Sequence, residues 1–120
     1  MKKKILVIDD EVSIRDLLAQ FLTSHGYLVT TAASAAEALV CAQREPPDLI
    51  LSDLQLEDAD GLEMIGQLKT LLPDTPVILL TGVLFDADIV RDVLNKKVAA
   101  YISKTSPLSK ILQEIHHLLS

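Results

Sequence analysis

The sequence has very little cysteine and no long apolar segment. Cys41 is the single cysteine, so an internal disulfide is excluded, and its place on an apolar helical face indicates a buried structural thiol. No uninterrupted apolar run approaches the roughly 18 residues that a transmembrane helix needs. Residues 1–4 lead directly into a short strand pattern rather than into the apolar stretch of a signal peptide. We therefore expect a cytoplasmic protein that does not span a membrane.

Basic residues are also scarce. Eleven Lys and Arg stand against 17 Asp and Glu, which gives a formal net charge of −6. This balance argues against direct binding of nucleic acid, because phosphate backbones are held mainly by Lys and Arg. The first predicted loop has no G-x-G-x-x-G pattern, so a dinucleotide-binding domain is poorly supported.

The length and the apolar content favour one domain. The chain has 120 residues, of which 49% are hydrophobic, enough for one continuous core. No linker, repeat or low-complexity segment divides it, and the last predicted helix ends with the chain. We expect residues 1–120 to be a single domain without an appended output domain.

Strand and helix patterns alternate five times along the chain. Short apolar strands that alternate with amphipathic helices predict parallel βαβ units, with right-handed crossovers that place helices on both faces of the sheet. The fold class is therefore α/β, with three layers. The expected strands are residues 4–8, 27–31, 49–52, 76–80 and 99–103, and the expected helices are residues 12–24, 34–45, 61–71, 86–95 and 106–119.

Three of the helices carry boundary signals. Ser34 with Glu37 three residues later is a capping box, and Ser106 followed by Pro107 predicts an N-cap and a first helical position. Gly26 follows the expected end of the first helix, as is common at helix C-termini.

Polar side chains follow four of the predicted strands. Asp9 and Asp10 come after the first strand, Asp53 after the third, Thr81 after the fourth and Lys104 after the fifth. Parallel α/β sheets bind ligands beyond the carboxyl ends of their strands. Three carboxylates, one hydroxyl and one ammonium would thus converge on one edge of the sheet, a set that suits a divalent cation and a phosphoryl group.

Each of these residues has an ordinary interpretation when it is taken alone. Asp9 and Asp10 could be a polar strand end facing a helix N-terminus, Lys104 a surface lysine and Thr81 a turn hydroxyl. Together they favour a site, because three carboxylates held close repel one another and Mg²⁺, which prefers oxygen ligands and phosphate oxygens, relieves that repulsion.

In this order and spacing, the residues resemble the receiver domain of two-component response regulators, over the whole chain. The matching positions are the acidic pair Asp9-Asp10, Asp53 with Gly61 eight residues later, Thr81, the strand aromatic Tyr101 and Lys104. The resemblance implies a flavodoxin-like (βα)5 doubly wound fold with strand order 2-1-3-4-5.

The resemblance also implies roles for these residues. Asp53 would accept a phosphoryl group from a phosphohistidine donor, and Lys104 would neutralise charge during the transfer. Asp10, Asp53 and the backbone carbonyl of Gln55 would bind Mg²⁺ directly, and Asp9 would act mostly through a metal-bound water. Such a chain is not a turnover enzyme, although it catalyses its own phosphorylation and dephosphorylation.

A conformational switch and partners follow from the same resemblance. Thr81 would move to the phosphoryl group and Tyr101 would follow inward, which would change the face formed by the helix at 86–95, the last strand and the last helix. The implied partners are a sensor histidine kinase or phosphotransfer protein and an output domain or downstream protein, and phosphorylation can drive dimerisation. Residues 83–85 are either loop core or part of that contact surface.

The sequence departs from the family pattern at two loops. Leu56-Glu57 stands where Met-Pro is usual, and Thr105 replaces the proline that usually follows the lysine through a cis peptide. Because a cis bond before a residue other than proline costs about 2.5–4 kcal/mol, we expect Lys104-Thr105 to be trans.

Two rival interpretations stay open. A pseudo-receiver would keep the fold and act only by docking, but such domains usually lose Asp53, Thr81 or Lys104. A phosphatase that uses an aspartyl phosphate generally needs a second Asp two residues after the nucleophile, where this chain has Gln55.

Overall fold

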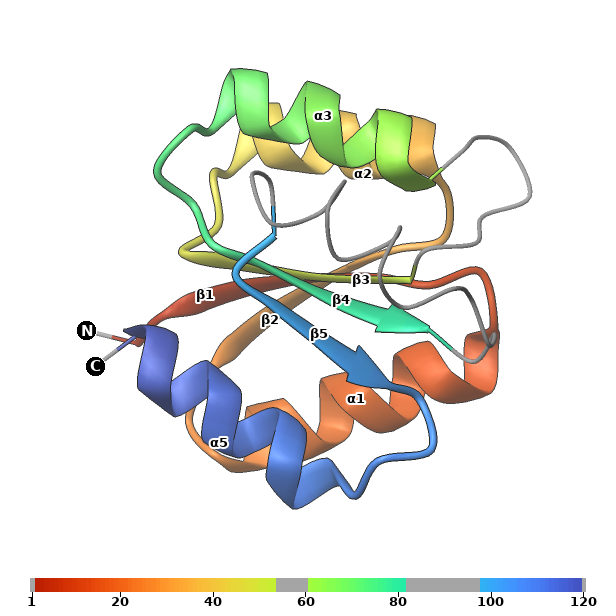
Figure 1. Ribbon diagram of the computed structural model, residues 1–120, viewed down its shortest axis with the longest axis vertical. Helices are drawn as coiled ribbons and strands as arrows, with labels where there is room; N and C mark the ends of the chain where they lie inside the picture. Colours follow the sequence, from red (N-terminus) through yellow and green to blue (C-terminus); the bar gives the residue numbers. More distant parts are fainter. Residues whose placement is uncertain (1, 54–60, 82–97, 120) are drawn as a thin grey trace.

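The computed structural model describes residues 2–53, 61–81 and 98–119, and its strands form one five-stranded sheet (Figure 1). The strand order is β2-β1-β3-β4-β5 and every neighbouring pair is parallel, as the sequence analysis predicted. The strands are β1 (Lys4–Ile8), β2 (Leu28–Ala32), β3 (Leu49–Asp53), β4 (Val77–Thr81) and β5 (Ala100–Ser103).

Helices cover both faces of this sheet and give three layers. Figure 1 shows α2 and α3 on one face and α1 and α5 on the other. The helix predicted at residues 86–95 lies outside the described residues. Within the described part of the chain, no helix is long and apolar enough to cross a membrane. The helices are α1 (Val12–Ser24), α2 (Ala35–Arg44), α3 (Gly61–Leu71) and α5 (Leu108–Leu119).

The core consists of two layers, one on each face of the sheet, because side chains alternate along each strand. In β1, Leu6 and Ile8 pack in the layer against α2 and α3, whereas Ile5 and Val7 pack in the layer against α1 and α5. The other strands follow the same alternation. In particular, Leu51 of β3 and Ile102 of β5 belong to the α1 and α5 layer, as Val7 does.

Four of the five strands differ from the predicted ranges by one residue at one or both ends, and β2 and β3 show local reasons for the difference. The second strand begins at Leu28 rather than Tyr27, because the Tyr27 N–H donates a hydrogen bond of 3.2 Å to the carbonyl of Leu22 at the end of α1. The chain reverses there through Gly26, whose φ of 92° favours glycine. The third strand includes Asp53, which pairs in register with Leu80 of β4.

The last helix also begins later than predicted. It starts at Leu108, so Pro107 precedes it instead of occupying the first helical position. The Ser106 N–H donates to the carbonyl of Ser103 at 3.0 Å, which places Ser106 in the turn after β5. The prediction that Ser106 caps this helix was therefore early by one residue.

The predicted cap of α2 is present. Ser34 is the N-cap in an extended conformation, and its hydroxyl accepts a hydrogen bond of 3.2 Å from the Glu37 N–H. The Glu37 carboxylate in turn accepts from the Ala33 N–H at 3.3 Å, one residue earlier than in the usual capping box.

Ser34→Ala is expected to lower the free energy of unfolding by about 1 kcal/mol, because it removes the acceptor for an otherwise unpaired helix N–H. Ser34→Thr keeps the hydroxyl and should retain most of the stability. Urea denaturation of both variants and the parent provides the measurement. Equal stability of Ser34→Ala and the parent would show that this cap contributes nothing.

Candidate functional site

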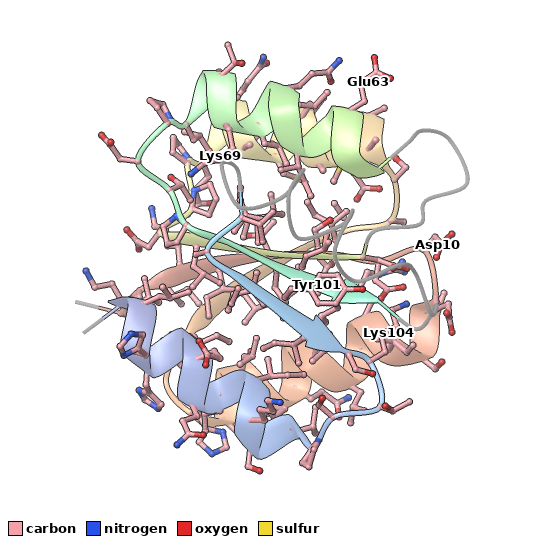
Figure 2. The ribbon with its side chains drawn as sticks, viewed as in Figure 1. Asp10, Glu63, Lys69, Tyr101 and Lys104 are labelled. Carbon is pink, nitrogen blue, oxygen red and sulfur yellow. The ribbon has the colours of Figure 1, made fainter. Side chains whose placement is uncertain are left out.

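The polar residues predicted at the strand ends meet beyond the carboxyl edge of the sheet. Asp9 directly follows β1, Asp53 ends the neighbouring β3, and Lys104 directly follows β5. Figure 2 shows Asp10 and Lys104 at this same end of the sheet. The residues that lie two positions before Asp9, Asp53 and Lys104 are Val7, Leu51 and Ile102, which all belong to the α1 and α5 core layer. Strand alternation therefore directs these three side chains toward a common side.

Lys104 is the centre of the site. Its ammonium nitrogen Nζ lies 2.8 Å from Asp53 Oδ2, 3.1 Å from Asp9 Oδ2 and 3.5 Å from Glu11 Oε1. The Lys104 side chain is 13% exposed, and both Asp9 and Asp53 are buried. A long flexible stem thus carries a positive charge from the fifth strand across β4 to carboxylates on β3 and β1.

Three carboxylates lie close enough to share one cation. Each of Asp9, Asp10 and Asp53 offers an oxygen, and these oxygens lie within 4.8 Å of one another. Asp9 Oδ2 is within ion-pair distance of Lys104 but, among the described residues, it is a buried side-chain oxygen without a hydrogen bond. A buried acceptor without a donor is costly unless a partner arrives. The residues present therefore fit a hard divalent cation such as Mg²⁺.

Burial and neighbouring charges shift the pKa values of Asp9 and Lys104. Burial raises the pKa of Asp9 and the nearby charge of Asp53 adds to this, while the Glu11 N–H and the Lys104 ammonium oppose it. Burial would lower the pKa of Lys104, but its contacts with Asp53 and Asp9 outweigh that effect and raise the pKa. Lys104 is therefore a permanent cation at neutral pH.

The loop after β1 is fixed by two further residues that the sequence analysis did not assign to the site. The Glu11 N–H donates to Asp9 Oδ1 at 2.9 Å, and the Arg15 guanidinium donates through Nη1 to the Asp9 carbonyl at 2.9 Å. Arg15 lies one helical turn after Glu11, near the start of α1. This spacing could have indicated that Arg15 reaches the end of β1.

Not every predicted site residue can be placed in full. Gln55 and residues 83–85 lie outside the described residues, and Thr81 is described only as the last residue of β4, paired with Ser103. Tyr101 is 45% exposed, so in this structure its side chain points largely to solvent rather than into the core.

The turn after Lys104 takes the conformation that the missing proline predicts. No peptide bond within the described segments is cis, so Lys104-Thr105 is trans. The hydroxyls of Ser103 and Thr105 lie 2.8 Å apart, and the Thr105 N–H donates to Ser103 Oγ at 3.2 Å. These bonds close the turn and hold the backbone that carries Lys104.

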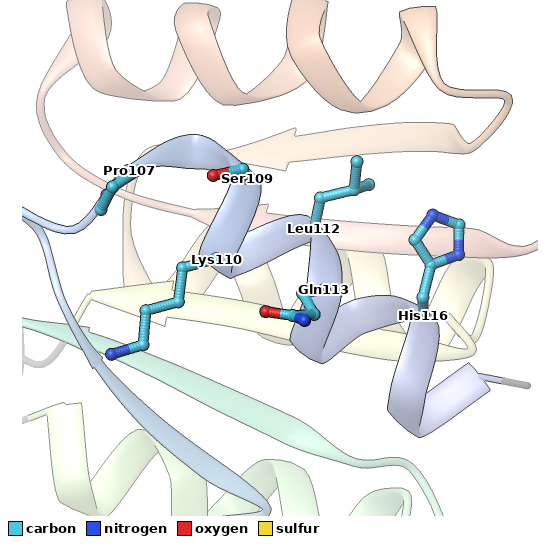
Figure 3. Close-up of a pocket in the computed structure, with 6 residues that line it drawn as sticks. All are labelled: Pro107, Ser109, Lys110, Leu112, Gln113 and His116. Atoms are coloured by element: carbon cyan, nitrogen blue, oxygen red, sulfur yellow. The ribbon is translucent and has the colours of Figure 1, made fainter.

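An open hollow on the surface of α5 shares no residue with the carboxylate cluster and has a different character (Figure 3). All of its lining residues come from α5 or from the residue before it, and none of them is acidic. It therefore offers no ligands for the chemistry of the strand ends. The lining residues are Pro107, Ser109, Lys110, Leu112, Gln113 and His116.

Comparison with known proteins points to one family. The family model of the response regulator receiver domain matches residues 5–116. A solved structure of a response regulator receiver domain protein (CheY-like) from Methanospirillum hungatei JF-1 is 34% identical and superimposes with a TM-score of 0.92, over 99% of this chain and 94% of that one. The match thus covers both the strand ends and the helical layers.

Curated relatives are longer than this chain. The response regulator protein VraR of Staphylococcus aureus is 35% identical over 117 residues, which cover 96% of this chain and 56% of that protein. The probable transcriptional regulatory protein TcrX of Mycobacterium tuberculosis is 30% identical over 118 residues, which cover 96% of this chain and 49% of that protein. This chain spans about half the length of these two relatives.

Proposed function

The chain belongs to the response regulator receiver domain family of two-component systems, and from this premise we propose that it accepts a phosphoryl group on Asp53. The observation that carries the proposal is the contact of Lys104 with Asp53 and Asp9, inside a cluster of three carboxylates. A buried nucleophile beside a fixed cation and a cation-binding cluster is the arrangement that phosphoryl transfer requires.

The transfer would proceed by in-line displacement. A carboxylate oxygen of Asp53 attacks phosphorus, the bond from phosphorus to the imidazole nitrogen of a phosphohistidine breaks, and the imidazole leaves with that electron pair and takes up a proton. Asp53 becomes an acyl phosphate. Because Asp53 pairs with Leu80 at the end of β3, its backbone is held in the sheet while the reaction occurs.

Lys104 and the carboxylates would have different electrostatic roles in the transfer. The Lys104 ammonium already contacts Asp53 Oδ2 at 2.8 Å and can follow the new phosphoryl oxygens, which carry negative charge. Asp10 and Asp53, with Asp9 and the Gln55 carbonyl, would hold Mg²⁺, which supplies charge neutralisation for the phosphoryl oxygens. Hydrolysis of the acyl phosphate would use the same groups. The domain would therefore set the lifetime of its own phosphorylated state without being a turnover enzyme.

The proposed output is a change of surface. Phosphorylation would draw the Thr81 hydroxyl toward Asp53, and the exposed ring of Tyr101 would turn inward beside it. The affected face includes β5 and α5 and would contact an output domain or a downstream protein. The proposal also includes dimerisation linked to phosphorylation. It further takes residues 1–120 as a single domain and the location as cytoplasmic.

The most direct rival is a pseudo-receiver that acts by docking alone. It differs from the proposal in chemistry, because it needs neither a phosphoryl group nor Mg²⁺. Three acidic residues placed to share a cation, together with a lysine that contacts two of them, are more than docking requires.

Incubation with a small phosphodonor and Mg²⁺ should add one phosphoryl group to the parent, seen as a gain in intact mass. Asp53→Asn should gain nothing, and a chelator should abolish the gain in the parent. Circular dichroism of each sample checks that the fold is kept. A folded parent that gains no mass would favour the pseudo-receiver.

A further inference from the structure

Glu11 occupies the N-cap of α1 but does not cap it with its side chain. Its conformation is extended, as an N-cap requires, yet its side chain accepts no hydrogen bond from the first turn of the helix. The carboxylate instead lies 3.5 Å from Lys104 Nζ, 93 positions later in the chain. The Glu11 N–H holds Asp9 at 2.9 Å, so Glu11 contacts both partners of the buried ion pair.

Three carboxylates surround the Lys104 ammonium. Two of its three N–H groups donate hydrogen bonds, to Asp53 at 2.8 Å and to Glu11 at 3.5 Å, and Asp9 lies within ion-pair distance. The Asp9 and Asp53 side chains are 1% and 6% exposed, whereas that of Glu11 is 58% exposed and makes the longest contact. Of the three, Glu11 is thus the partner that can move away into water at the least cost.

We propose that Glu11 is a positioning residue that holds Lys104 in the unphosphorylated state and competes with the phosphoryl group for the Lys104 N–H that it now accepts. The inference rests on the proposed function of Asp53. A phosphoryl group carries negative charge and needs a donor from Lys104, so it repels the Glu11 carboxylate and takes its place. Glu11 therefore sets how readily Lys104 becomes available to an incoming phosphodonor.

Two measurable consequences follow. In Glu11→Gln no anionic side chain competes for this N–H, so a phosphodonor should reach half-saturation at a lower concentration. The ammonium also loses a partner on the outer side, so it should associate more closely with Asp9 and Asp53, where it competes with Mg²⁺. Binding of Mg²⁺ should therefore weaken in the same variant.

The control is a second exposed glutamate with a lysine partner. Glu45 lies 3.2 Å from Lys4, with 55% of its side chain exposed, and Lys4 begins β1, so this pair is at the opposite end of that strand. Glu45→Gln removes the same charge from the same kind of surface pair. It separates a local effect on Lys104 from an effect of net charge.

The test measures the rate of phosphorylation of parent, Glu11→Gln and Glu45→Gln against the concentration of acetyl phosphate at saturating Mg²⁺. Glu11→Gln should lower the half-saturating concentration about two- to fivefold, the range of an exposed ion pair. Its limiting rate should stay within about twofold of the parent, as expected when only ground-state competition is removed. Glu45→Gln should match the parent.

A calorimetric titration with Mg²⁺ gives a readout that needs no phosphorylation. Mg²⁺ should bind Glu11→Gln about two- to fivefold more weakly than it binds Glu45→Gln. If the parent gains no phosphoryl group, the proposed function fails and the titration alone decides the role of Glu11. A Glu11→Gln variant that matches Glu45→Gln in either measurement, or that needs more phosphodonor than the parent, would overturn the inference.

Discussion

Lys104→Met is expected to lower the free energy of unfolding by about 3 kcal/mol at neutral pH in the presence of a chelator. Methionine keeps much of the apolar stem but removes the charge that contacts Asp53 and Asp9. Both carboxylates are buried, and Lys104 forms an ion pair with each of them. The variant would therefore remove a counter-ion that two buried carboxylates share. Chemical denaturation measures the loss.

The pH dependence of this loss identifies its cause. Burial already raises the pKa of Asp9, and without the opposing ammonium this pKa rises further. The folded variant then binds a proton that the unfolded chain does not bind between the two pKa values, so its stability rises as pH falls through the folded pKa. The deficit relative to the parent should shrink when the pH is lowered from about 7 to about 5. This explanation would be contradicted if the loss of unfolding free energy did not change with pH. It would also be contradicted if Lys110→Met, at an exposed position, showed the same loss.

Mg²⁺ is expected to stabilise the parent by about 2.7 kcal/mol at a free concentration one hundred times its dissociation constant. The gain arises because the folded state gathers Asp9, Asp10 and Asp53 within reach of one ion and the unfolded chain does not. Asp10→Asn should lose most of this gain, since it removes one charged ligand. In chelator the same variant should be more stable than the parent, because one of three mutually repelling carboxylates is gone.

Asp16→Asn is the matched control for that experiment. Asp16 lies on an exposed position of α1 and is not part of the acidic cluster, so its removal changes the net charge equally. Thermal unfolding of the parent and both variants, each with Mg²⁺ and with chelator, gives the six values needed. The account would be contradicted if Asp16→Asn behaved like Asp10→Asn, or if Mg²⁺ stabilised Asp10→Asn as much as the parent.

Strand pattern and strand ends made most of the fold and the centre of the site predictable. Central strands of a parallel sheet are apolar on both faces, so residues 4–8, 49–52 and 76–80 stood out, and the polar residues after them had to share one edge. The convergence of Asp9, Asp53 and Lys104 is confirmed. The roles given to Gln55 and to the Thr81 hydroxyl stay predictions.

The contacts that the sequence did not predict are those set by tertiary placement. Glu11 follows the acidic pair and could equally have faced the N-terminus of α1, and only the position of β5 brings Lys104 to its carboxylate. Leu17 of α1 shows the same limit, since an apolar residue one position before the buried Leu18 has a side chain that is 52% exposed. Helical periodicity gives only the approximate orientation of a side chain. How many residues of an apolar helix face are buried depends on the elements that pack against the helix.

The geometry of the site depends on the register of the whole sheet. Strand alternation that places Val7, Leu51 and Ile102 in one core layer also directs the residues two positions later toward one side. Packing and chemistry are therefore set by the same register. A slip of one residue in β3 would turn Asp53 away from Lys104.

The central claim is that Asp53 forms an acyl phosphate, and reduction of that bond tests it most directly. Borohydride converts an acyl phosphate to an alcohol, so a phosphorylated and then reduced chain should carry homoserine in place of Asp53. Peptide mapping by mass spectrometry should find this change at Asp53 alone, and only in samples given both phosphodonor and Mg²⁺. Reduction at Asp9 or Asp10 instead, or at no position in a folded chain, would contradict the account.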